Sequence, residues 1–247
     1  MNKNSLYVSL LALAVSAGAL VIATNKCGEK KEASAPVVSE TQIAAMLEKN
    51  PQMVVNALQK FEEQQREIEE KESAKLFLEH IDELNNDATT PYVGPKDAKV
   101  VLVEFFDFSC GFCKRIAEAM DIVVKNNPDV KVVFKPITFV SPISKYAAQA
   151  AIAAGEQGKF MEVYKVLLTS SEALDEEKIN ALVEKEGLDM KKFKADVNSE
   201  KTLKVIENAA NLANKTGVRG VPSLVLNGKK INTIEAEGIQ AAIDVLK

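Results

Sequence analysis

The feature that most constrains the fold is the passage from an apolar run to a pair of cysteines between residues 100 and 124. Residues 100–106 read Val-Val-Leu-Val-Glu-Phe-Phe, a composition and length that predict one buried strand. After the cysteines the apolar residues recur at helical spacing, at Ile116, Met120, Val123 and Val124. Cys110 and Cys113 are therefore expected where a strand passes into a helix, with Cys110 at the helix N-terminus.

That position predicts redox chemistry at the two thiols. The unpaired backbone N–H groups and the positive dipole end of a helix N-terminus stabilise an anion, and a Cys-x-x-Cys motif placed there favours the thiolate of its first cysteine. Cys113 follows Cys110 by one helical turn, which is close enough for a disulfide between them.

Two other interpretations of the motif stay open, a zinc site and an inert structural disulfide. A zinc site needs two further ligands, and the other candidates in the chain are Cys27 and the single histidine, His80. Neither belongs to a second ligand motif, so we expect no metal ion and no cofactor.

The first 23 residues predict export. Lys3 supplies a positive start, residues 6–23 are almost entirely apolar, and Ala17-Gly18-Ala19 resembles a signal-peptidase site. The apolar stretch is also nearly long enough to span a bilayer, so a retained membrane anchor is the alternative. Either form places the protein in the periplasm or cell envelope, an oxidising compartment in which a redox dithiol has a purpose.

Cys27 resembles the modified cysteine of a bacterial lipoprotein, because it follows the apolar segment directly. However, Asn25 and Lys26 stand where a lipidation signal has small residues. We expect a free or removed thiol here, with lipidation as the less favoured alternative.

Residues 24–40 form a linker, and residues 41–90 a helical extension interrupted at Asn50-Pro51. An apolar stripe of Met53, Val54, Leu58 and Phe61 is followed by the charge-rich segment 62–75. A helix this polar either projects from the protein or packs its apolar stripe against another subunit. We therefore predict a homo-oligomer assembled through residues 41–90.

The remainder, residues 91–247, predicts a mixed α/β domain. Pro91, Gly94 and Pro95 mark its boundary, and a second strand is expected over residues 130–137. Several helices fill residues 141–216, after which come the strand 223–226, an Asn-Gly hairpin turn and the strand 229–231. A helix over residues 235–246 closes the domain. The net charge of −4 and the lack of a long basic cluster argue against nucleic acid as a partner.

This order of elements, with the segments Val103–Lys114, Gly217–Ser223 and Asn227–Lys229, resembles the DsbA family of exported thiol:disulfide oxidoreductases. The resemblance implies a thioredoxin-like fold with a helical insertion, preceded by a helical extension. That extension is similar to the one in oligomeric or surface-associated members of the family.

The resemblance also implies roles for individual residues. Cys110 corresponds to the more exposed, attacking thiol and Cys113 to the thiol that resolves mixed disulfides. Pro222 corresponds to a cis-proline facing the dithiol, and Val221 offers its backbone to a substrate strand. Gly111 and Phe112, between the cysteines, complete the expected substrate-binding set.

Glu104 lies in the middle of the apolar strand, where a carboxylate is costly unless it has a function. In the family a buried acid at this place handles protons beneath the dithiol. The alternative is a glutamate on an exposed face of the strand. Strongly oxidising members carry a histidine between the cysteines, whereas this chain has Gly111 and Phe112, so strong oxidising power is less assured here.

Together these features predict a thiol:disulfide oxidoreductase of the bacterial cell envelope that oxidises or isomerises disulfides in exported, cysteine-containing proteins. A membrane redox partner would reset its dithiol. The alternative function is an envelope chaperone or surface-binding protein that retains a thioredoxin scaffold with a vestigial dithiol.

Overall fold

The computed structural model describes residues 39–247. The expected leader of residues 1–23, Cys27 and almost all of the linker 24–40 lie outside the described residues. Over residues 39–247, none of the helices combines the length and the apolar character needed to span a bilayer.

The described chain divides into two units, residues 39–55 and residues 56–247. The first unit contains helix α1 (Glu40–Lys49) and the start of α2 (Pro51–Glu79). Ser39 caps α1, since its Oγ accepts a hydrogen bond from the Gln42 backbone N–H at 3.3 Å. Asn50 separates the two helices, and Pro51 begins α2 at a position where a missing N–H is tolerated.

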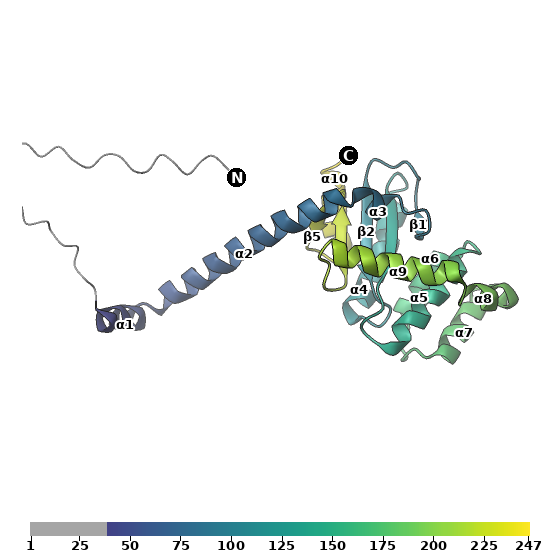
Figure 1. Cartoon of the computed structure of the whole chain (residues 1–247), viewed down its shortest axis with the longest axis horizontal. Coiled ribbons are helices and arrows are strands. Elements are labelled where there is room, and N and C mark those ends of the chain that lie inside the picture. Colours follow the sequence, from purple (N-terminus) through teal and green to yellow (C-terminus); the bar gives the residue numbers. More distant parts are fainter. Residues whose placement is uncertain (1–38) are drawn as a thin grey trace, which may run out of the picture. The chain divides into compact units, whose positions relative to one another are not determined.

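The second unit combines strands and helices (Figure 1). After α2 the elements are α3 (Ile81–Asn85), β1 (Tyr92–Val93), β2 (Val101–Phe106), α4 (Gly111–Asn126), β3 (Lys131–Pro136), α5 (Pro142–Gly155), α6 (Phe160–Leu168), α7 (Glu176–Lys185), α8 (Met190–Asp196), α9 (Glu200–Lys215), β4 (Ser223–Leu226), β5 (Lys229–Ile231) and α10 (Ala236–Asp244). Five helices stand between β3 and β4. The predicted α/β fold with a helical insertion is therefore confirmed.

The five strands form one sheet in the order β1-β3-β2-β4-β5. The central strand β2 runs parallel to β3 and antiparallel to β4, and Glu104 lies opposite Phe134 on one side and Leu224 on the other. The short strand β1 pairs antiparallel with β3 and was not predicted. It has only two residues, and it lies among the turn-forming residues that mark the expected boundary.

Each face of the sheet is covered by its own hydrophobic cluster, so every residue of β2 is buried. One cluster joins Phe106 and Phe134 to helices α4, α5 and α6 and contains both Cys110 and Cys113. The other joins Val103 and Phe105 to Phe77 and Leu84 at the end of the helical extension. Burial on both faces explains why the strand reads as a continuous apolar run rather than an alternating one.

A buried lysine fastens the segment after α3 to the sheet. Lys135 on β3 is fully buried, and its Nζ donates hydrogen bonds to the Glu83 carbonyl oxygen at 3.0 Å, Asp87 Oδ2 at 3.2 Å and Thr90 Oγ1 at 2.8 Å. Burial alone would raise the pKa of Asp87, but hydrogen bonds from Thr89 and the positive charge of Lys135 outweigh it and lower that pKa to about 2. The last part of the extension is thus held in the core of the second unit.

Candidate active site

The dithiol lies at the start of α4, where β2 has just ended. Cys110 is the N-cap residue of α4, with φ −82° and ψ 121°, and its backbone N–H donates to the Asp107 carbonyl oxygen at 3.0 Å. The thiols of Cys110 and Cys113 are both free in this structure. The predicted passage from strand to helix N-terminus is therefore present.

The two thiols differ in accessibility and in environment. Cys110 is 8% exposed and Cys113 is completely buried. Burial raises the pKa of the Cys113 thiol far above its ordinary value, and interactions with Glu104 and Cys110 raise it further. Cys110 is thus the thiol that a substrate can reach, whereas Cys113 remains protonated until a base removes its proton.

The peptide bond between Val221 and Pro222 is cis, as the resemblance implied. It directly precedes β4, and it brings the Val221 carbonyl oxygen to 3.4 Å from the Cys110 Sγ, which donates a hydrogen bond to it. Val221, more than a hundred residues away in sequence, therefore lies against the Cys110 thiol, directly before the cis-proline.

Glu104 is completely buried in the middle of β2. Its Oε2 accepts a hydrogen bond from the Tyr164 hydroxyl at 2.8 Å, and its Oε1 has no hydrogen-bond partner among residues 39–247. Burial raises the pKa of Glu104 to about 8, although the Tyr164 hydrogen bond acts in the opposite direction. The alternative of an exposed strand face is wrong, because β2 is the central strand and both of its faces are covered.

Tyr164 on α6 was not predicted as a site residue. Its ring lies 5.1 Å from the Phe106 ring and 5.0 Å from the Phe134 ring, measured between centroids. It lies in an apolar helical stretch, which is typical of a core residue, and no sequence signal links it to a carboxylate 60 residues earlier.

Asp107 and Ser144 were also missed. The buried Asp107 carboxylate accepts hydrogen bonds from the Ser109 N–H at 2.8 Å, the Val140 N–H at 3.0 Å and the Ser144 hydroxyl at 2.6 Å. These bonds tie the turn before Cys110 to the loop after β3 and to the first turn of α5. An Asp two residues before a Ser is a recognisable turn signal, but its distant partners are not visible in sequence.

Exposed apolar side chains lie on the segments that this network joins. Phe112 is 59% exposed, Phe139 60% and Val140 44%. The Arg115 guanidinium lies 4.7 Å from the centre of the Phe112 ring, and Gly111 has open space around it. The predicted substrate-binding residues Gly111 and Phe112 are thus exposed, and the loop at 139–140 adds apolar surface that the sequence did not indicate.

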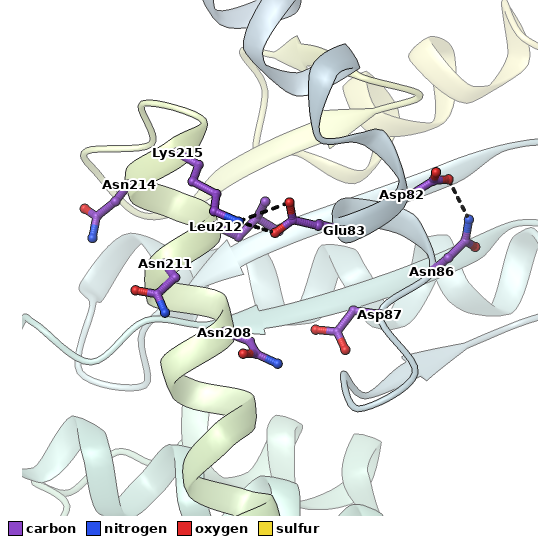
Figure 2. Close-up of a pocket in the computed structure, with 9 residues that line it drawn as sticks. All are labelled: Asp82, Glu83, Asn86, Asp87, Asn208, Asn211, Leu212, Asn214 and Lys215. Atoms are coloured by element: carbon purple, nitrogen blue, oxygen red, sulfur yellow. Dashed lines mark hydrogen bonds and ion pairs between the residues drawn. The ribbon is translucent and has the colours of Figure 1, made fainter.

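A cavity of about 710 Å³ lies elsewhere in the second unit, between α3 and α9 (Figure 2). Figure 2 shows the Lys215–Glu83 ion pair, at 2.8 Å, across it and the Asn86–Asp82 hydrogen bond at its rim. Its lining consists of carboxylates, amides, one lysine and Leu212 and contains no thiol, so it is separate from the dithiol site. Over residues 39–247, no three His, Cys, Asp or Glu side chains are placed to hold a metal ion.

Comparison with known proteins gives curated relatives that are much longer than this chain. The Na(+)/H(+) antiporter NhaA 3 of Salinispora tropica is 29% identical over 153 residues, which make up 61% of this chain but only 24% of the antiporter. The chain therefore spans about a quarter of the length of such a relative, and the activity of the whole antiporter is not transferred to it.

Solved structures match over a larger share of their own length. A thioredoxin-like oxidoreductase from Silicibacter pomeroyi DSS-3 is 30% identical with a TM-score of 0.62, covering 66% of this chain and 95% of that one. The thiol-disulfide exchange protein alpha-DsbA2 from Wolbachia pipientis is 24% identical with a TM-score of 0.66, covering 72% of this chain and 97% of that one. The second likeness supports the fold alone.

A sequence profile of the thioredoxin family, with the description "Thioredoxin", matches residues 85–245, which is more than half of the chain. This match includes both cysteines, Glu104, Tyr164 and the cis-proline. The chain therefore belongs to the thioredoxin family, with the DsbA-like form of the fold.

Proposed function

We propose that this protein is a thiol:disulfide oxidoreductase that acts on cysteine-containing exported proteins through Cys110 and Cys113. The observation that carries the proposal is the contact between the Cys110 thiol and the Val221 carbonyl oxygen beside the cis-proline. An extended substrate that pairs with the Val221 backbone would present its own sulfur beside Cys110.

The reaction needs only the two thiols and the substrate disulfide. The Cys110 thiolate attacks one sulfur of that disulfide, forming a mixed disulfide and releasing one substrate thiolate, which takes up a proton. The Cys113 thiol then passes its proton to a neighbouring base, and its sulfur attacks the Cys110 sulfur. This second step releases the other substrate thiol and leaves a Cys110–Cys113 disulfide, so the substrate gains two electrons and the dithiol loses two. Oxidation of a substrate dithiol is the same sequence in reverse.

Catalysed reduction of insulin by a small thiol tests this proposal. We expect the mature protein to accelerate precipitation of the insulin B chain, and Cys110→Ala to abolish the acceleration. Absence of acceleration by the wild-type protein would refute the proposal. An ability to keep unfolded proteins soluble that survives in Cys110→Ala would favour the alternative, a binding protein with a vestigial dithiol.

Export to the periplasm or cell envelope is part of the proposal, and it rests on the leader sequence of residues 1–23. A signal peptide, a retained anchor at residues 6–23 and a lipid on Cys27 predict different masses for the mature protein. A membrane redox partner would be needed to reset the dithiol after each net oxidation or reduction of a substrate, because such a turnover changes the redox state of the dithiol.

We further propose that the protein forms a homo-oligomer through residues 41–90 and that this assembly supports disulfide isomerisation. Three apolar side chains of α2 support this idea: Leu58 is 56% exposed, Phe61 58% and Ile68 48%. Burial against a second copy of the same helix would remove this surface from water. Several dithiols around one space could hold a misoxidised substrate while its disulfides are exchanged.

A further inference from the structure

We infer that Tyr164 is a positioning residue for thiol–disulfide exchange, because its hydroxyl orients the Glu104 carboxyl group and favours the ionised form that takes the proton from Cys113. The inference rests on the proposed function and assigns a task to a residue on the helical insertion. Phenylalanine would fill the same aromatic cluster at this position, so the hydroxyl is the distinctive group.

The geometry of the pair supports this assignment. The Tyr164 hydroxyl donates to Glu104 Oε2 at 2.8 Å, and both side chains are completely buried. A buried hydroxyl is costly unless it is hydrogen-bonded, and bonds to a carboxylate are stronger than bonds between neutral groups. The tyrosine ring is held in place by Phe106, Phe134 and Phe160, with centroid distances of 5.0–6.0 Å. The hydroxyl therefore meets the carboxylate with little freedom to move away.

The other carboxylate oxygen is the one available for chemistry. Glu104 Oε1 is buried and has no hydrogen-bond partner among residues 39–247. The Cys113 thiol is also buried, and it is near enough to Glu104 and Tyr164 for their charges to influence one another. A carboxylate with one oxygen fixed and the other free is suited to accept a proton from a neighbouring thiol.

No buried cation competes with Tyr164 for this role in the described chain. Glu104 is flanked in the sheet by the apolar residues Phe134 and Leu224. Lys135 follows Phe134 in β3, and since successive strand residues face opposite ways, it points to the other face, where it binds Glu83, Asp87 and Thr90. The titratable groups that face Glu104 are thus Tyr164 from α6 and Cys113 from α4, with Cys110 beyond Cys113.

The hydrogen bond sets how much carboxylate exists near neutral pH. Burial raises the pKa of Glu104 to about 8 and the Tyr164 hydroxyl acts to lower it, so the neutral acid predominates at pH 7 and the hydrogen bond increases the ionised fraction. Without the hydroxyl this fraction falls. In the resolving step the Cys113 proton moves to the Glu104 carboxylate, the Cys113 sulfur bonds to the Cys110 sulfur, and the bond from Cys110 to the substrate sulfur breaks.

The resolving step can be followed directly with dithiobis-nitrobenzoate, a disulfide whose thiol product is coloured. Attack by Cys110 on this reagent releases one coloured thiolate, and attack by Cys113 on the resulting mixed disulfide releases the second. We expect Tyr164→Phe to leave the first phase unchanged and to slow the second phase roughly 3- to 10-fold at pH 7. The rising limb of its pH profile should move to higher pH, so that the rate approaches the wild-type rate well above pH 8.

Tyr146→Phe is the matched control, because it also removes a hydroxyl, one that donates to Asn180 Oδ1 at 2.8 Å. It should behave like the wild-type protein. In Glu104→Gln the rate of the second phase should no longer rise with pH in this way. Adding Tyr164→Phe to Glu104→Gln should not change that rate further.

The outcomes separate the inference from the proposed function. A wild-type protein without a second phase would contradict the proposed function itself. A normal wild-type second phase would overturn only the inference if Tyr164→Phe kept the wild-type profile, if it slowed the reaction equally at every pH, or if Glu104→Gln kept the rising limb.

Discussion

Among the single residues of the site, Glu104 is the one whose burial is unfavourable for the stability of the fold. An ionisable side chain in the middle of a buried strand is stable mainly as the neutral acid, and its pKa of about 8 expresses that preference. An apolar side chain at this position would avoid the cost of burying a carboxyl group, so the glutamate is explained by chemistry rather than by stability.

The unfavourable burial of the ionised Glu104 predicts that the free energy of unfolding depends on pH. Because the pKa of Glu104 is raised from 4.5 to about 8 on folding, the folded state holds a proton that the unfolded state has lost between these values. Its contribution to the free energy of unfolding therefore falls as pH rises through this window and is constant above it. In urea titrations, Glu104→Gln should have a higher free energy of unfolding than the wild-type protein. The difference should be about 3 kcal/mol larger at pH 8 than at pH 5.

Glu118→Gln, at an exposed position of α4, is the matched control for this measurement and should show no such gain. A Glu104→Gln stability difference that stays constant with pH would mean that Glu104 does not titrate as described.

Phe112, between the two cysteines, is a second residue whose substitution should change the chemistry of the site. It is exposed and offers neither charge nor a hydrogen bond to the dithiol. Phe112→His should stabilise the reduced, thiolate-containing form and make the protein more oxidising, by roughly tenfold in its equilibrium with glutathione, or about 30 mV. Phe112→Leu serves as the control, and equal equilibria for the two variants would contradict the role given to the residues between the cysteines.

At the scale of elements, local patterns predicted most of the fold. The apolar run before Cys110, the helical spacing after it and the Asn-Gly turn led to β2, α4 and the β4–β5 hairpin within a few residues of their observed ends. Strand β1 was missed because two residues carry no periodicity. The pairs Tyr164–Glu104 and Ser144–Asp107 could not be predicted, since each joins residues far apart in the chain that meet only when the insertion folds onto the sheet.

The Ser144–Asp107 hydrogen bond joins α5 to the end of β2, so we expect it to stabilise the packing of these two elements. Ser144→Ala would remove a buried hydroxyl that donates to Asp107 at 2.6 Å and fixes the start of α5 to the end of β2. We expect the free energy of unfolding to fall by about 1–3 kcal/mol in denaturant titrations. Ser171→Ala, at an exposed position after α6, should leave stability unchanged, and an equal effect of both would argue against the coupling.

In the molecule as a whole, the helical extension predicted over residues 41–90 is not separate from the sheet, because its last part is packed into the same core. Phe77 and Leu84 are buried in the second core cluster, and Asp87 and Thr90 satisfy the buried Lys135. A deletion through residue 90 would therefore damage the thioredoxin domain as well as removing the extension. A deletion of residues 24–72 avoids this, because every residue from 39 to 72 is exposed.

We expect this deletion variant to be a monomer by light scattering, to retain insulin reduction and to lose the refolding of scrambled disulfides. The intact mature protein should be oligomeric at micromolar concentration. A monomeric intact protein would remove the oligomer, and with it the main argument for isomerisation.

Trapping of mixed disulfides in the envelope distinguishes the thiol that attacks substrates, Cys110, from the thiol that resolves the product, Cys113. Cys113→Ala lacks the resolving thiol, so it should accumulate covalent complexes with exported proteins that disappear on reduction. Cys110→Ala leaves the dithiol site with the completely buried Cys113 thiol alone and should trap almost none. Equal trapping by the two variants, or trapping by Cys110→Ala alone, would contradict this account.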